Sequence, residues 1–143
     1  MASIDLSGNW KLDRNSENID DFWNFLSEGA SFIQRQKLNV AKKFKPACVI
    51  LQNGNHIRIE TKALKTMTDE YDIGVPVETE QIGAKYKATA SWEDNKLKTD
   101  MVPNGDKGFS HMIYRELVDD ELVLNIVVPS KNVNVKRYFK RQG

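Results

Sequence analysis

The sequence predicts an all-β protein with antiparallel strands and one pair of helices inserted after the first strand. Polar and apolar residues alternate with a period of two over most of the chain from residue 47 onward. Turn-forming pairs such as Asn53-Gly54, a strong short-range hairpin signal, separate the alternating segments at even spacing. Residues 17–45 instead carry apolar side chains at steps of three and four, as helices do. Short strands joined by tight turns form a barrel or a sandwich.

Size and composition indicate one folded domain over residues 1–143. The 21 Lys and Arg residues against 20 Asp and Glu give a formal net charge of +1, which is no indication of a nucleic-acid coat. No apolar run approaches the ~20 residues of a membrane span. The N-terminus lacks the basic start and apolar stretch of a secretory signal, so we expect a cytoplasmic location, with the nucleus as an additional one.

The first strand and the two helices are expected before residue 46. A short strand over 9–12 is followed by a helix that the Ser16 or Asn18 side chain would cap, with acids in its first turn, at its positive end. Gly29 is a plausible stop for this helix. A second helix is expected over about 32–40. The apolar stripe of the first helix consists of Ile19, Phe22, Trp23, Phe25 and Leu26.

The remaining strands follow the alternation, and turns rich in Gly, Asn, Asp and Pro separate them. They are expected at 49–51, 56–61, 68–73, 75–79, 85–92, 96–102, 109–118, 121–128 and 133–140. The single cysteine, Cys48, excludes an internal disulfide. Its apolar neighbours favour a buried side chain over a reactive thiol.

Two of these strands each place one arginine in the middle of an apolar face. Arg115 alternates with His111, Ile113 and Leu117, and Arg137 alternates with Val133, Val135 and Phe139. Two interpretations are open. The arginines point outward or pair with an acid such as Glu116, or they enter a water-containing cavity and hold the carboxylate of an apolar ligand, for which arginine suits better than lysine. A register shifted by one residue would turn Lys136 and Tyr138 inward, but the apolar alternation argues against it.

The sequence gives no indication of catalysis. It contains two histidines, His56 and His111, and no nucleophile elbow, P-loop, GxGxxG motif or Cys/His metal spacing. We therefore expect no enzyme, no cofactor and no metal site. His111, beside Arg115, is either a core histidine or a polar group of the cavity.

Several short motifs together carry a family resemblance over essentially the whole chain. They are Gly8-x-Trp10-x-Leu12, Asn18-Ile19-Asp20-Asp21-Phe22, Phe32-x-x-Arg35-Gln36, Tyr114-Arg115-Glu116-Leu117-x-Asp119-Asp120-x-Leu122 and Arg137-x-Phe139. The chain resembles the intracellular lipid-binding proteins, the family of fatty-acid-binding and retinoid-binding proteins, and its last residues are most similar to nematode members. The resemblance implies a ten-stranded antiparallel up-and-down β-barrel (β-clam) closed by a helix–turn–helix lid, about residues 17–45.

The resemblance also implies a function and a site. Two cavity arginines and a tyrosine that hold the ligand carboxylate in the fatty-acid branch fall here on Arg115, Arg137 and Phe139, and the phenylalanine lacks the tyrosine hydroxyl. The implied protein is a monomeric, non-catalytic carrier of a long-chain fatty acid or related hydrophobic carboxylate. The remaining implied contacts are Ile113, Leu124 and Val135 on the ligand tail, and Phe32, Leu64 and Lys65 at the entrance.

Residues 29–59 form a basic stretch without acids. Its cations are Arg35, Lys37, Lys42, Lys43, Lys45 and Arg58, a local charge of +6. They either cover a solvated lid or dock transiently on an anionic membrane, where each cation contributes ~1 kcal/mol; basic clusters also act in nuclear import. The alternative function is a regulatory protein whose basic lid binds a membrane, a receptor or nucleic acid. Nucleic acid is not expected, because few aromatic residues accompany the cations.

Overall fold

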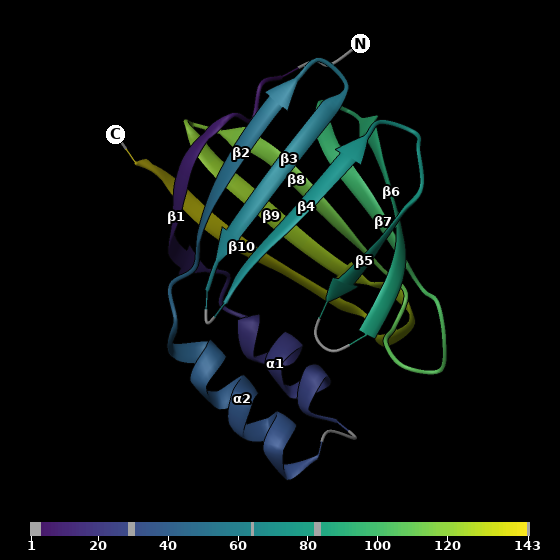
Figure 1. The fold of residues 1–143 in the computed structure, drawn as a ribbon. Coiled ribbons are helices and arrows are strands. Elements are labelled where there is room, and N and C mark those ends of the chain that lie inside the picture. The colour runs from purple at the N-terminus through teal and green to yellow at the C-terminus, as the bar shows by residue number, and fades with distance from the viewer. Residues whose placement is uncertain (1–3, 29–30, 64, 82–83, 143) are drawn as a thin grey trace.

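The computed structural model describes residues 4–28, 31–63, 65–81 and 84–142. It contains ten strands in one antiparallel sheet and two α-helices that follow the first strand (Figure 1). The strands are β1 (Gly8–Asn15), β2 (Ala47–Asn53), β3 (His56–Lys62), β4 (Thr66–Asp72), β5 (Val77–Gln81), β6 (Ala84–Glu93), β7 (Lys96–Pro103), β8 (His111–Val118), β9 (Glu121–Val128) and β10 (Val133–Gln142). The helices are α1 (Ile19–Ser27) and α2 (Phe32–Lys43), and a 3₁₀ turn, η1, spans Pro129–Lys131. The predicted fold class is confirmed.

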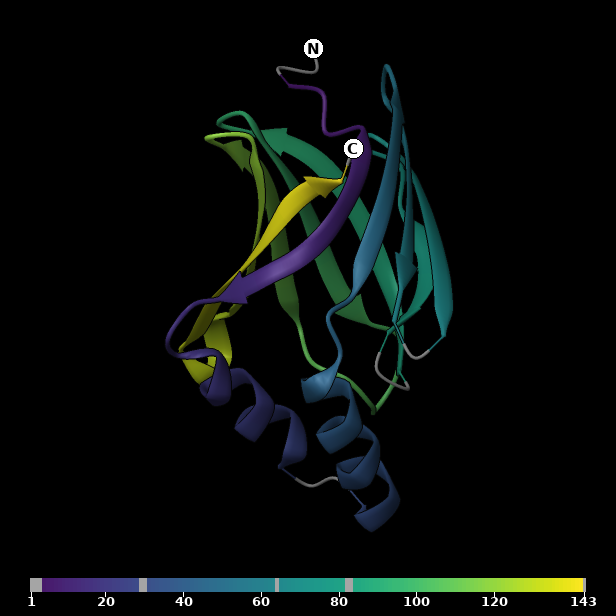
Figure 2. The ribbon, with the colours of Figure 1, turned by 90° about the vertical axis from the view of Figure 1, so that its left-hand side faces the viewer.

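The sheet curls into a nearly closed barrel with the order β4-β3-β2-β1-β10-β9-β8-β7-β6-β5. Pairing of β1 with β10 joins the two ends of the chain, and the helices lie at one end of the barrel while both termini lie at the other (Figure 2). β4 and β5 are the two edges of the sheet. Side chains link these edges, because Asp69 accepts hydrogen bonds from Thr79 Oγ1 at 2.5 Å and from Gln81 Nε2 at 3.2 Å.

The larger core cluster runs along the inside of the barrel, with Trp10 at the end away from the helices. Trp10 is 1% exposed, and its indole N–H donates to the carbonyl of Leu6 at 3.0 Å. The Arg141 guanidinium covers the outer side of the ring at 4.3 Å from its centroid. The largest side chains buried with Trp10 come from most of the strands, namely Ile50, Ile57, Ile59, Tyr86, Leu97, Met101 and Leu122. Alternation with a period of two places them on one face.

The two helices, together called the lid, differ in how they pack. α1 buries Phe22 and Trp23 against Ile126 and Val135 and their neighbours on β9 and β10. α2 has a complete capping box at Ser31 but no buried residue. Neither described helix is long and apolar enough to cross a membrane.

The expected side-chain cap of α1 is wrong. Asn18 occupies the N-cap position, but its Nδ2 donates to the carbonyl of Asn134 at 2.8 Å. Ser16 Oγ accepts the backbone N–H of Lys136 at 3.0 Å. Both side chains therefore bind the backbone of β10 in place of the helix. Helix α1 ends at Ser27, and Gly29 lies outside the described residues.

Strands β5 and β8 each begin two residues later than predicted, for local reasons. β5 begins at Val77 and not at Val75, because Gly74 adopts a φ of +82° and the Val75 N–H closes a turn on Asp72. β8 begins at His111 and not at Phe109. The Phe109 ring instead packs edge-on against Phe25 of α1, with the ring centroids 4.7 Å apart.

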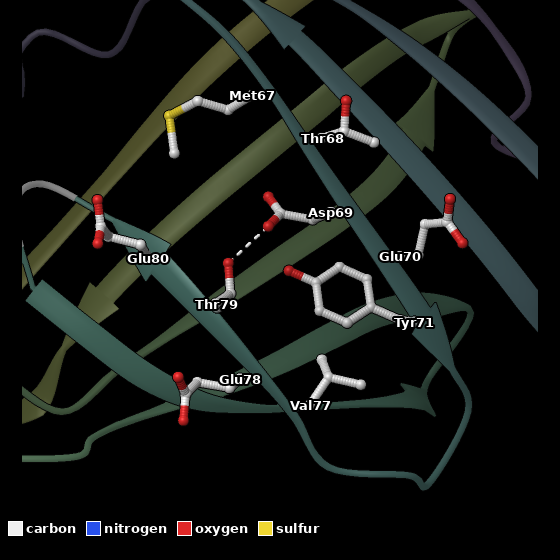
Figure 3. Close-up of a pocket in the computed structure, with 9 residues that line it drawn as sticks. All are labelled: Met67, Thr68, Asp69, Glu70, Tyr71, Val77, Glu78, Thr79 and Glu80. Atoms are coloured by element: carbon white, nitrogen blue, oxygen red, sulfur yellow. Dashed lines mark hydrogen bonds between the residues drawn. The ribbon is translucent and has the colours of Figure 1, made fainter.

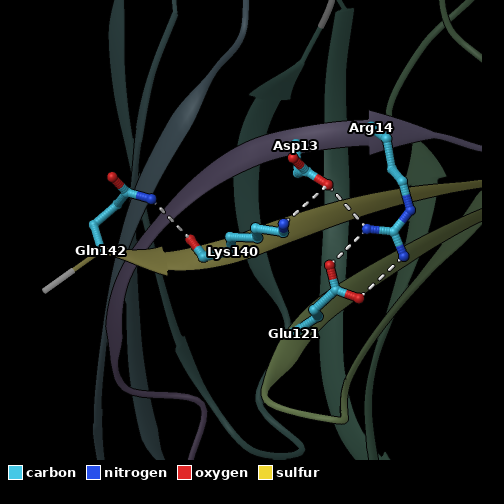
Figure 4. A network of polar contacts seen from close by, with 5 residues as sticks. All are labelled: Asp13, Arg14, Glu121, Lys140 and Gln142. Atoms are coloured by element: carbon cyan, nitrogen blue, oxygen red, sulfur yellow. Dashed lines mark hydrogen bonds and ion pairs between the residues drawn. The ribbon is translucent and has the colours of Figure 1, made fainter.

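An exposed polar network joins β1, β9 and β10 on the outside of the barrel (Figure 4). Arg14 donates to both carboxylate oxygens of Glu121, at 2.6 and 3.0 Å, and to Asp13 at 3.0 Å. Lys140 lies 3.8 Å from the same Asp13 oxygen. The hydrogen bond from Arg14 lowers the pKa of Glu121. The network fastens the first strand to the last hairpin.

Candidate functional site

One row of directly paired residues crosses the inner face of the barrel and contains both arginines. Arg115 of β8 pairs with Leu97 of β7 and Leu124 of β9. Leu124 pairs in turn with Arg137 of β10, which pairs with Asn15 of β1. Paired residues point to the same face of a sheet, and Leu97 is fully buried. Both arginines therefore face inward, two strands or about 10 Å apart at the backbone.

The alternative register does not occur. Lys136 is exposed, and the ring of Tyr138 lies outside the barrel with the guanidinium of Arg14 at 4.3 Å from its centroid. The suggested outward pairing with Glu116 does not occur either, because Glu116 pairs with Lys96 at 3.3 Å.

The Arg115 side chain extends from β8 into the interior of the barrel. Its Nη1 atom is buried and has no hydrogen-bond partner among the described residues. Its positive charge acts on Cys48 of β2 and Tyr71 of β4, on the opposite wall. Burial outweighs that charge, raising the pKa of Cys48 to about 11 and the pKa of Tyr71 to about 12. Cys48 is thus a buried, protonated thiol, as its apolar neighbours indicate.

Arg137 connects the barrel wall to the lid. Its Nε donates to Asn15 Oδ1 at 2.8 Å, and its guanidinium lies 5.7 Å from the ring centroid of Trp23 in α1. Burial lowers the pKa of Arg137. In the described ranges, no acidic side chain forms an ion pair within 4.0 Å of Arg137 or Arg115. Over the described residues, the inner face therefore carries two positive charges that form no direct ion pair with an acid.

The other predicted ligand contacts surround this row. Phe139 is 5% exposed and pairs with Leu122, one step toward the end of the barrel that lies away from the helices. Ile113 and Val135 both pair with Ile126, one step toward the lid. Together with Leu124 they form an apolar surface around the arginines.

The structure does not bring the predicted entrance residues to the arginines. Phe32 is 75% exposed on α2, Lys65 is exposed beside the start of β4, and Leu64 lies outside the described residues. The predicted docking cations lie exposed on α2 or directly after it; they are Arg35, Lys37, Lys42, Lys43 and Lys45. They form a separate surface at the lid.

The sequence analysis missed polar groups on the inner face. Asp69 lies on the inner side of a cleft of about 350 Å³ between β4 and β5, beside Tyr71 (Figure 3). Asp69 lies two residues before buried Tyr71 in an alternating strand, so the two side chains share a face, and this signal could have identified Asp69. Trp92 Nε1 and Thr99 Oγ1 are also buried without a partner among the described residues. Trp92 pairs with Leu97, so it extends the row that contains both arginines.

His111 is a core histidine, not a group aimed at the arginines. Its side chain is 6% exposed, and Nδ1 donates to the carbonyl of Phe109 at 2.9 Å. The ring packs at 5.2 Å from Tyr86 and 4.7 Å from Phe109, measured between centroids. Burial lowers the pKa of His111.

We expect His111 to make the folded protein sensitive to acid. Because the folded pKa lies below the ordinary value of 6.5, the unfolded chain binds the proton more readily. The stabilisation is complete above pH 6.5 and is lost as the pH falls toward the folded pKa. In His111→Phe, the loss of unfolding free energy between about pH 7.5 and about pH 5.5 should shrink, as measured by urea denaturation.

His56 provides the matched control. The hydrogen bond to Asp72 raises the pKa of exposed His56, so its contribution is present at low pH and fades as the pH rises through the folded pKa. His56→Gln should therefore make the protein more sensitive to acid. An unchanged acid response in His111→Phe would contradict the expectation.

Comparison with known proteins gives relatives over most of the chain. No family model matches. The chain is 34% identical to mouse retinoid-binding protein 7 over 116 residues, which cover 76% of this chain and 81% of that protein. It is 32% identical to Bos taurus cellular retinoic acid-binding protein 2 over 124 residues, covering 84% and 87%. The solved structure of the REP1-NXSQ fatty acid transporter superposes with a TM-score of 0.78 at 25% identity over 96% of both chains.

Proposed function

This chain belongs to the intracellular lipid-binding protein family, and from that premise we propose that it is a non-catalytic carrier of a long-chain fatty acid or a similar amphipathic carboxylate. The observation that carries the proposal is the inward row with Arg115 and Arg137, two partly buried cations without an acidic partner among the described residues. The names of the relatives and of the similar structure include both retinoic acid and fatty acids, and both of these ligands are carboxylic acids.

The chemistry of the row suits a carboxylate head group. A buried guanidinium without a counter-charge costs several kcal/mol, which a bound anion offsets. Arginine holds carboxylates with two parallel hydrogen bonds. The apolar surface of Ile113, Leu124 and Val135 would contact the tail, whose burial contributes ~25 cal/mol per Å². Phe139 offers no hydroxyl, so recognition of the head group would depend on the arginines.

Paired titrations test this proposal. Delipidated protein is titrated with a fluorescent fatty acid and with the matching alcohol, in the wild type and in Arg137→Gln. We expect stoichiometric binding of the acid and a preference for it over the alcohol that falls by about ten- to a hundredfold in the variant, the loss of one charge-assisted contact. Arg35→Gln, an exposed change on α2, should keep the preference. Equal binding of acid and alcohol by the wild type would overturn the carboxylate assignment.

We further propose that the lid docks on anionic membranes during collection or delivery of the ligand. The supporting observation is α2, which exposes Phe32 and Ile33 (66%) among its cations and buries no side chain. Such a helix resembles those that lie in the membrane interface. If delipidated protein binds no lipid at all, the same surface supports the second candidate function, a regulatory protein that acts through its lid.

A further inference from the structure

A groove on the outer wall of the barrel lies beside the C-terminal end of α2. It has a volume of about 510 Å³, within the range of small-ligand sites. It is called here the basic groove, and its lining residues are Lys11, Lys43, Phe44, Lys45, Ala47, Lys62 and Ala63. Four of the seven are lysines, and the other three are apolar.

Strand register concentrates positive charge at this place. Lys11 of β1 pairs with Ala47 of β2, which pairs with Lys62 of β3. On its other side, Lys11 pairs with Lys140 of β10. Residues paired across strands share a face, and like charges that face each other directly are destabilising. The row thus carries three lysines over four adjacent strands, at a backbone spacing of about 4.8 Å per strand.

The acids near the basic groove are already shared with other cations. Lys62 lies 3.8 Å from Glu60, which also pairs with Arg58 at 3.6 Å. Lys140 lies 3.8 Å from an Asp13 oxygen that Arg14 contacts more closely (Figure 4). Over the described residues, Lys11, Lys43 and Lys45 form no ion pair with an acid within 4.0 Å.

Helix stabilisation explains only part of this charge. Lys43 lies in the last turn of α2, where a cation is favourable at the negative end of the helix. Lys11 and Lys62 lie on strands, and they gain nothing from the helix. The positive charge of the groove is therefore left for an external anion.

The apolar part of the groove indicates which anion. Phe44 is 43% exposed and lies beside Ala47 and Ala63. A small soluble anion would gain no favourable contact from an exposed aromatic ring, whereas aromatic residues are favoured at the head-group level of membranes. The groove is also continuous with α2, whose apolar residues Phe32 and Val40 are exposed.

We propose that the basic groove binds the head group of an anionic phospholipid that carries more than one phosphate, with the lysines around the phosphates and Phe44 against the glycerol region. This inference rests on the proposed docking of the lid on membranes. It adds selectivity for a head group to a docking step that would otherwise depend on total charge alone.

Vesicle binding tests the inference. Phosphatidylcholine vesicles that contain a phosphatidylinositol bisphosphate are compared with phosphatidylcholine vesicles that contain phosphatidylserine at the same total negative charge. Wild-type protein should bind the former about tenfold more tightly or better. Lys11→Gln combined with Lys62→Gln should remove this preference while retaining binding to phosphatidylserine. Arg35→Gln combined with Lys37→Gln, the matched change on α2, should weaken binding to both vesicles and keep the preference.

Three outcomes would overturn the inference: equal binding of wild type to the two vesicles, an unchanged preference in the groove variant, or equally tight binding of free inositol trisphosphate, which would indicate a site for soluble anions. Fatty-acid titration of the same variants without vesicles separates this result from the carrier proposal. A failure of ligand binding there would count against the carrier alone. Circular dichroism verifies that the variants, all at exposed positions, are folded.

Discussion

Replacing Arg115 by methionine is expected to stabilise the unliganded protein and to weaken binding of the proposed carboxylate ligand by about a hundredfold. The buried Nη1 of Arg115 has no partner among the described residues, and its neighbours in the row, Leu97 and Leu124, are apolar. Methionine has a similar length and needs no counter-charge. Replacing buried charges by apolar groups often stabilises by about 1–4 kcal/mol. Stability rises while ligand affinity falls, because the charge that destabilises the unliganded barrel is the one that would bind the ligand carboxylate.

Urea denaturation and ligand titration of the same preparation measure both effects. Arg35→Met on the exposed lid is the control, and it should change neither quantity beyond about 0.5 kcal/mol. A variant that is less stable than the wild type would show that Arg115 has a structural partner in solution. Unchanged carboxylate affinity would remove Arg115 from the proposed site.

The second large effect is expected for Trp10→Ala, which should reduce the free energy of unfolding by about 3–5 kcal/mol. The indole is 1% exposed, donates to the carbonyl of Leu6 and lies in the large core cluster. Truncation leaves a cavity and an unpaired carbonyl, and it also removes the ring that Arg141 covers. Since whole domains are stable by about 5–15 kcal/mol, the loss is a large fraction of the total.

Far-UV circular dichroism in urea measures this loss without depending on tryptophan fluorescence. Trp23→Ala provides the comparison, because Trp23 packs α1 onto the barrel end and its loss should leave the large core cluster intact. We expect a smaller reduction for Trp23→Ala than for Trp10→Ala. The reverse order would show that packing of the lid contributes more to the stability of the fold than the core around Trp10 does.

Much of the strand order could be predicted because the hairpins are local. The hairpin that Asn53-Gly54 signals does form, although its two-residue loop is Gly54-Asn55, between the paired residues Asn53 and His56, with Gly54 at a φ of +61°. Asp119 and Asp120 form a two-residue turn with positive φ that pairs Val118 with Glu121. Counting back from that turn places Arg115 opposite Leu124, so part of the candidate site was accessible from the sequence. Closure through β1 and β10 was not, since it joins residues at opposite ends of the chain and came from the family resemblance alone.

The errors arose where tertiary contacts override a local preference. Ser16 and Asn18 are good helix caps, yet their side chains bind β10, which no local pattern reveals. Asp69 escaped notice because an acid in an alternating strand normally faces solvent. The pairing of Arg137 with Leu124 depends on the 3₁₀ turn between β9 and β10, whose geometry the sequence does not fix.

The barrel has a seam where β4 and β5, the two edge strands, are not paired with each other. A fully paired barrel can widen only by breaking a ladder of backbone hydrogen bonds, whereas this barrel can open along the seam. Among the described residues, that opening breaks the two hydrogen bonds that Asp69 accepts, each with a net contribution of about 1 kcal/mol. We therefore expect this seam to open before any of the paired strands separates.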